Sequence, residues 1–171
     1  MRVASVEAIT TELERAGVRY LVAGGLAVTA HGYLRLTNDV DLVISLDPAN
    51  VQGAFRALAS LGYRPAVPVR ADEFADRVIR EAWIRDKGMH VLQFWSDKHR
   101  ETPVDVFVTE PFPFDEEYTA AYTGELAPGV IARFVRLKTL IRMKEAAARP
   151  RDLDDVQHLR WILEDQGDER A

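Results

Sequence analysis

Two short β-like segments with a glycine pair between them constrain this chain more than any other feature. Residues 18–23 (Val-Arg-Tyr-Leu-Val-Ala) run directly into Gly24-Gly25, and residues 26–34 then have the composition of a short helix. Residues 39–45 (Asp-Val-Asp-Leu-Val-Ile-Ser) form a second β-like segment. Short runs rich in β-branched residues and bounded by glycine are typical of strands. The sequence therefore predicts a strand, a glycine turn, a helix and a second strand in immediate succession.

Helical patterns flank these two strands. Residues 3–16 and residues 47–62 carry apolar side chains at helical spacing, and a glycine marks the end of each pattern. Asp47 and Pro48 supply an N-cap and a proline at the first helical position. This alternation predicts an α/β (α+β) fold, with a mixed sheet flanked by helices.

The second half of the chain continues the sheet and ends in helices. Residues 89–96 and 103–110 predict the two strands of a hairpin. Residues 63–69 contain two prolines and predict an edge strand, because proline cannot donate to a sheet ladder. Residues 71–84 predict a helix, and residues 129–135 are ambiguous but compatible with a last strand. The C-terminal helical part is expected over about 136–164, as helices at 136–148 and 151–164, with a frayed tail at 165–171.

The composition indicates one folded domain over residues 1–171. Hydrophobic residues make up 47% of the chain, which is enough for a core. Trp83, Trp95 and Trp161 are expected to lie in that core, although Trp95 and its strand neighbour Phe94 cannot both face inward. The chain has no cysteine, which excludes a disulfide framework and a zinc–thiolate site.

No apolar run approaches the ~20 residues that a membrane span needs, so we expect no membrane partner. The first 17 residues include three glutamates and no uninterrupted apolar stretch, which is not typical of a signal peptide. Together with the lack of cysteine, this predicts a cytoplasmic protein.

The charge is unevenly distributed along the chain. The formal net charge is −5, which argues against a surface built mainly to hold nucleic acid. Residues 133–151 nevertheless contain seven basic residues and one acidic residue, so this segment is +6 and the remainder is −11. A solvated basic helix explains this pattern, and so does a surface that meets phosphates.

Asp39 and Asp41 place two carboxylates on the same face of a strand, about 6.5–7 Å apart. Two ionised carboxylates this close repel each other unless a counter-charge is present. Magnesium binds through one or two carboxylates together with substrate phosphates, and would supply that charge. An exposed and merely solvated strand end is the alternative.

The glycine pair and a third aspartate extend this pattern. Gly24 and Gly25 lead directly into a helix, so bare backbone N–H groups would be available to a phosphate, although a simple tight turn also explains them. Asp105 interrupts an apolar strand and needs a partner if it is buried; Asp97, in a polar link, is a weaker candidate. A nucleoside triphosphate with magnesium accounts for all these features.

The residues resemble the nucleotidyltransferase fold of the DNA polymerase beta superfamily, whose motif is Gly-Gly or Gly-Ser, a spacer, Asp-x-Asp and a third acidic residue. Within that superfamily the chain is most similar to AbiEii-type bacterial nucleotidyltransferases. Residues 140–159 also look like the end of that group, whereas residues 63–88 have no counterpart. The matching series here is His31-Gly32, Arg35, Thr37, Asp39 and Asp41.

The resemblance implies a metal-dependent transfer of a nucleoside monophosphate from a nucleoside triphosphate to an acceptor hydroxyl, with release of pyrophosphate. It implies two magnesium ions, held by Asp39 and Asp41 with Asp105, and a role for Asp105 in accepting the proton of the acceptor. Gly24 and Gly25 would hold the β- and γ-phosphates. The other expected nucleotide contacts are Arg35, Thr37 and Lys144.

Lys144 has a second argument, because Leu137, Leu140, Ile141 and Lys144 share one helical face. A lysine on an apolar face either extends its ammonium to solvent or reaches an anion. Arg149 is a weaker candidate of the same kind, and partner or capping roles are expected for Asp152 and Asp155.

Three functional classes stay open. The AbiEii-type resemblance implies a toxin-like enzyme that acts on RNA, with an antitoxin protein as a possible partner. The same fold serves enzymes that modify small-molecule antibiotics, and an acidic protein would suit a cationic acceptor. A non-catalytic module that binds a nucleotide or a protein is the third class.

Overall fold

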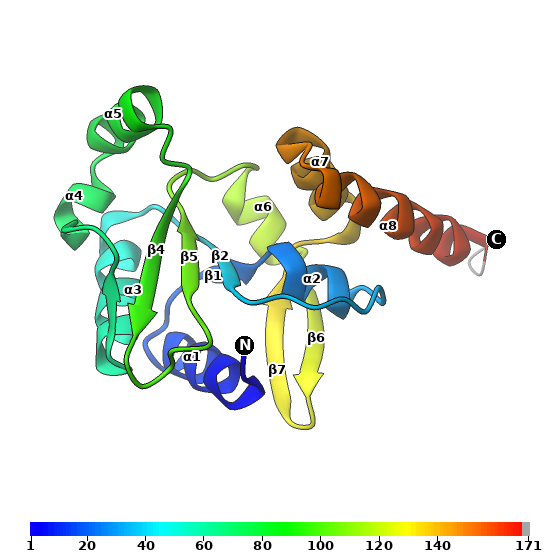
Figure 1. Ribbon diagram of the computed structural model, residues 1–171, viewed down its shortest axis with the longest axis horizontal. Coiled ribbons are helices and arrows are strands. Elements are labelled where there is room, and N and C mark those ends of the chain that lie inside the picture. The colour runs from blue at the N-terminus through cyan, green and yellow to red at the C-terminus, as the bar shows by residue number, and fades with distance from the viewer. Residues whose placement is uncertain (169–171) are drawn as a thin grey trace.

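A seven-stranded mixed sheet forms the centre of the molecule (Figure 1). The computed structural model describes residues 1–168, with side chains up to Gln166. The strand order is β3-β4-β5-β2-β1-β7-β6, so β2 and β5, which carry the predicted carboxylates, are neighbours. The strands are β1 (Tyr20–Val22), β2 (Val40–Ile44), β3 (Tyr63–Pro65), β4 (Val91–Ser96), β5 (Val104–Phe107), β6 (Tyr122–Ala127) and β7 (Val130–Phe134).

Eight helices flank this sheet in the part of the chain that the structure describes. Figure 1 shows α3, α4 and α5 near the β3–β4 end, and α7 and α8 beyond α2 on the other side of the view. The helices α7 and α8 pack against each other, and α7 also contacts α2. The helices are α1 (Val3–Arg15), α2 (Gly24–Ala30), α3 (Pro48–Ser60), α4 (Ala71–Ala75), α5 (Arg77–Lys87), α6 (Phe114–Thr119), α7 (Leu137–Ala147) and α8 (Pro150–Asp168).

The alternation of side chains along the strands separates a core face from a polar face. Val40 and Leu42 of β2 are fully buried, as are their register partners in β5. On the same face, Phe94 of β4 meets the ring of Phe55 from α3 edge-on, with ring centroids 5.1 Å apart. Asp41 lies between Val40 and Leu42 and therefore points to the opposite face.

The predicted fold class is confirmed, and most predicted elements lie where the sequence placed them. The edge strand β3, the β4–β5 hairpin and the ambiguous last strand β7 are all present. The Asp47 carboxylate caps α3 by accepting hydrogen bonds from the backbone N–H groups of Ala49 and Asn50. None of the described helices is long and apolar enough to cross a membrane.

Three predictions about elements and packing need correction, and one strand was missed. The helix expected at 71–84 is two helices, because Asp76 is extended, ends α4 and caps α5. The strand β6 was not predicted at all; it forms a hairpin with β7. The frayed tail expected at 165–171 is helical as far as Asp168, and its last three residues lie outside the described part. Trp95 and Trp161 are 38% and 51% exposed rather than buried in the core.

Candidate active site

Three carboxylates converge on the polar face of the sheet. Asp39 lies immediately before β2, Asp41 lies within it, and Asp105 lies in β5. Because β2 and β5 are parallel neighbours with Asp41 opposite Asp105, the two side chains share one face. One oxygen from each of the three carboxylates lies within 4.8 Å of the others. The structure brings these three aspartates together, as the sequence predicts.

The electrostatics of this cluster call for a cation. Burial and the nearby charges of Asp39 and Asp105 raise the pKa of Asp41 to about 6, although the positive charges of Lys144 and Arg149 oppose this shift. Burial likewise raises the pKa of Asp105. Three convergent oxygen donors with excess negative charge fit a hard divalent cation such as Mg²⁺. The residues present therefore fit the metal that the sequence suggests.

Two hydrogen bonds orient the outer carboxylates. The hydroxyl of Thr37 donates to Oδ1 of Asp39 at 3.1 Å, and the amide of Gln93 donates to Oδ1 of Asp105 at 3.1 Å. Gln93 lies opposite Asp105 in the β4–β5 pairing and is solvent-exposed. No sequence motif marks Gln93, but its position between Leu92 and Phe94, which strand alternation places on the core face, predicts that it faces the polar side.

The glycine pair makes room for these side chains. Gly24 has a φ of 59°, and a Cβ atom built on it would lie 1.7 Å from Oδ2 of Asp41. A Cβ atom on Gly25 would lie 2.5 Å from Oγ1 of Thr37 and 2.9 Å from a guanidinium nitrogen of Arg35. The first turn of α2 can approach the carboxylates this closely only because neither residue has a side chain.

Lys144 of α7 and Arg149 of the α7–α8 turn lie near Asp41. Both form ion pairs with aspartates of α8. The Lys144 ammonium is buried and lies 2.9 Å from Oδ1 of Asp152 and 2.9 Å from Oδ2 of Asp155. Arg35 lies 3.1 Å from Oδ1 of Asp155. Arg149 contacts Asp152 at 2.6 Å, yet its side chain is 75% exposed. The predicted partner roles of Asp152 and Asp155 match these ion pairs, so the anion that Lys144 reaches belongs to its own chain.

Comparison with known proteins supports the same fold. No protein-family model matches the sequence, and no curated protein matches it either. Among solved structures, the lincomycin-bound lincosamide antibiotic adenylyltransferase LnuA aligns with a TM-score of 0.63 at 13% identity, over 95% of this chain and 98% of that chain. The chain has a nucleotidyltransferase fold.

An antibiotic-resistance factor aligns with this nucleotidyltransferase fold almost as closely. The solution structure of the antibiotic-resistance factor ANT(2'')-Ia has a TM-score of 0.60 at 13% identity, over 98% of this chain and 85% of that chain. Its crystal structure with adenylyl-2''-tobramycin has a TM-score of 0.60 at 14% identity, over 98% and 91% of the two chains. At such identities the likeness establishes the nucleotidyltransferase fold, and the chemistry must be argued from the residues.

Proposed function

We propose that this chain is a metal-dependent nucleotidyltransferase, which moves a nucleoside monophosphate from a nucleoside triphosphate such as ATP to an acceptor hydroxyl. The observation that carries the proposal is the convergence of Asp39, Asp41 and Asp105 beside Gly24 in a nucleotidyltransferase fold. A structural role alone would not favour three carboxylates whose burial and mutual repulsion together raise the pKa of Asp41.

The three aspartates would hold two Mg²⁺ ions, which supply charge neutralisation for the triphosphate and lower the pKa of the acceptor hydroxyl. Asp105, oriented by Gln93, would accept the proton of that hydroxyl. The acceptor oxygen forms a bond to the α-phosphorus, the bond from that phosphorus to the bridging oxygen breaks, and pyrophosphate leaves. Catalysis rests on positioning and charge neutralisation.

A different observation supports each of the proposed nucleotide contacts. Gly24 and Gly25 offer close backbone approach next to Asp41. Thr37 holds Asp39, which gives it a positioning role in addition to any nucleotide contact. Lys144 and Arg35 both contact Asp155, so they are fixed near the site and share their charge with that carboxylate. The exposed guanidinium of Arg149 is a further proposed phosphate contact.

The acceptor is best explained as a small molecule. On the polar face, Gln93 and Trp95 continue the sheet surface beyond Asp105, and both are exposed. The guanidinium of Arg64 lies over the Trp95 ring, 3.9 Å from its centroid. Together with Gln93, these two side chains form an aromatic and hydrogen-bonding surface beside the proposed proton acceptor, Asp105. The solved structures with this fold include proteins that modify antibiotics, which supports an acceptor of that size.

RNA is the second candidate acceptor. The series from His31 to Asp41 resembles AbiEii-type enzymes, and a toxin-like activity with an antitoxin partner follows from that resemblance alone. The specific observation in its favour is the excess positive charge of residues 133–151, with seven basic residues and one acidic residue. The two acceptors differ in salt response, because binding of RNA weakens steeply as salt rises.

Thermal unfolding with each nucleoside triphosphate, with and without Mg²⁺, tests the proposal. We expect a Mg²⁺-dependent rise in Tm that is lost in Asp39→Ala/Asp41→Ala. Asp86→Ala should keep it, because this exposed carboxylate pairs only with Arg85. Pyrophosphate release with candidate acceptors then tests the reaction. A protein that shows no rise with any nucleotide would instead be a module for binding another partner.

A further inference from the structure

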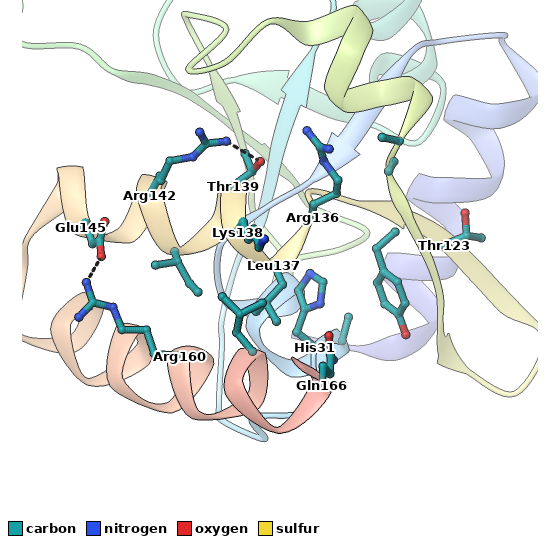
Figure 2. A pocket seen from close by; sticks show the side chains of 16 residues that line it. His31, Thr123, Arg136, Leu137, Lys138, Thr139, Arg142, Glu145, Arg160 and Gln166 are labelled. Carbon is teal, nitrogen blue, oxygen red and sulfur yellow. Dashed lines mark hydrogen bonds and ion pairs between the residues drawn. The ribbon is translucent and has the colours of Figure 1, made fainter. Parts of the chain in front are cut away.

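A second potential binding site lies away from the carboxylates. A pocket of about 1110 Å³ opens between the end of α2, the start of β6, and the helices α7 and α8 (Figure 2). None of the residues assigned above to metal or nucleotide lines it. This volume slightly exceeds the usual range for pockets that bind drug-sized ligands, so the pocket has room for much more than a small ion.

The lining of this pocket is basic in an acidic protein. Among the side chains that the structure describes, the cationic ones in the lining are Arg136, Lys138, Arg142 and Arg160, and Glu145 is the one acidic one. Glu145 pairs with Arg160, as the dashed line in Figure 2 shows. The pocket therefore carries a local excess of positive charge, whereas the chain as a whole is −5.

Two of these cations form no ion pair with any carboxylate in the part of the chain that the structure describes. The guanidinium of Arg136 contacts the buried carboxylate of Glu117 at 2.7 Å. Among the described residues, no ion pair engages Lys138 or Arg142, and Arg142 donates only to the Thr139 hydroxyl, at 3.2 Å. Lys138 and Arg142 are one turn apart on α7 and exposed, on a different face of the helix from Lys144. They are free to neutralise an anion in the pocket.

His31 and Tyr122 form an aromatic pair in the lining of the pocket. Nε2 of His31 donates to the backbone carbonyl of Val135 at 2.8 Å, which fixes the ring. Burial lowers the pKa of His31, so the ring is neutral at pH 7. Tyr122 packs on it with ring centroids 4.9 Å apart and remains 42% exposed. A Cβ atom on Gly124 would lie 2.8 Å from the Tyr122 ring, so the glycine leaves room for this orientation.

We propose that this pocket binds single-stranded nucleic acid. Phosphates would contact Lys138 and Arg142, and a base would stack on Tyr122. A cationic surface beside a preformed aromatic face is the usual arrangement for binding single strands without sequence preference. The apolar side chains in the lining, including Leu137 and Ile141, would contact the ribose and base edges. The proposal goes beyond nucleotidyl transfer and does not depend on it, because the three aspartates take no part.

Fluorescence anisotropy with a short labelled single-stranded RNA tests this proposal. EDTA in the buffer prevents any metal-dependent binding at the carboxylates. We expect Lys138→Glu/Arg142→Glu to bind at least about tenfold more weakly, and its log–log salt slope to be shallower by about 1.4, the value for two lost phosphate contacts on a single strand. Lys87→Glu/Lys98→Glu changes the net charge equally at exposed positions elsewhere and should retain most of the affinity.

Two further variants keep the test independent of folding. Circular dichroism checks each protein, and Lys138→Gln gives a milder change at the same site. Tyr122→Leu keeps the charge and should weaken binding several-fold through lost stacking. Equal weakening in both charge-reversal variants, or full affinity in Tyr122→Leu, would overturn the proposal. So would AMP that binds as tightly as the RNA with the same dependence on Lys138, because the ligand would then be a free nucleotide.

Discussion

The ionised side chain of Asp41 destabilises the metal-free folded protein, although the proposed function depends on it. Its neighbours on the polar face are Asp39 and Asp105, and its Oδ2 atom lies where a side chain on Gly24 would have been. A carboxyl whose pKa rises from 3.8 to about 6 on folding binds protons more tightly in the folded state. Between those pH values the free energy of unfolding therefore falls as pH rises.

Asp41→Asn should stabilise the metal-free protein at pH 7. The substitution removes a penalty that amounts to roughly 1–3 kcal/mol once Asp41 is ionised. The difference from the unmodified protein should shrink as pH falls and nearly vanish near pH 3, below both pKa values, where Asp41 is largely protonated in the folded and unfolded states. Urea denaturation in EDTA at the two pH values measures this, with exposed Asp86→Asn as the control. A variant that is less stable at pH 7 would contradict the argument.

Gly24→Ala should disrupt the site through a clash as well as through backbone strain. The new Cβ atom would lie 1.7 Å from Asp41, at a φ of 59°. Gly17→Ala is the matched control, because Gly17 has a φ of 65° and open space around its Cβ position. We expect about 1–2 kcal/mol of destabilisation for Gly17→Ala and several kcal/mol for Gly24→Ala. Equal losses in the two variants, measured by urea denaturation, would mean that α2 can move away from Asp41.

The turn between the elements α7 and α8 contains an alanine in the left-handed backbone conformation. Ala148 ends α7 with a φ of 51° and is the one non-glycine residue with positive φ among the described residues. This turn leads directly to Arg149 and to Asp152, which binds the Lys144 ammonium. The strained residue therefore lies where two helices must meet at a fixed angle beside the site.

Ala148→Gly should stabilise the protein by about 0.5–1 kcal/mol. Glycine adopts the left-handed conformation without the steric cost that alanine bears, and part of that gain is offset by its greater freedom in the unfolded chain. Ala147→Gly, one residue earlier and within α7, should destabilise by a similar amount. Opposite signs for the two variants in chemical denaturation are expected, and a destabilised Ala148→Gly would show that the strain is absent.

Sequence patterns predicted the elements whose signals are local. Asp47-Pro48 marked the start of α3, and the apolar alternation around Asp105 marked β5. The strand β6 was not predicted, because it contains Gly124 and lacks a local strand pattern. Its pairing with β7 stabilises it instead. Lys144 was correctly placed on a buried face, but its partners depend on how α8 packs against α7, which no local pattern encodes.

For the whole molecule, the prediction of one domain over residues 1–171 has a direct test. The strand β7 pairs with β1, and α7 packs on α2, so the C-terminal part is joined to the sheet at two places. We expect far-UV circular dichroism and tryptophan fluorescence to report one coincident unfolding transition. Trp161 in α8 and Trp83 in α5 lie in different parts of the molecule, so two separate transitions would show that the C-terminal helices unfold independently.

The pairing of Val22 with Phe134 joins the first strand of the chain to the last. During translation, β1 leaves the ribosome first, and every other strand is synthesised before β7 can reach it. Such distant pairing makes folding slow, because the intervening chain must be ordered before the contact stabilises it. The nascent protein therefore carries β1 with one sheet edge unpaired until β7 has been synthesised.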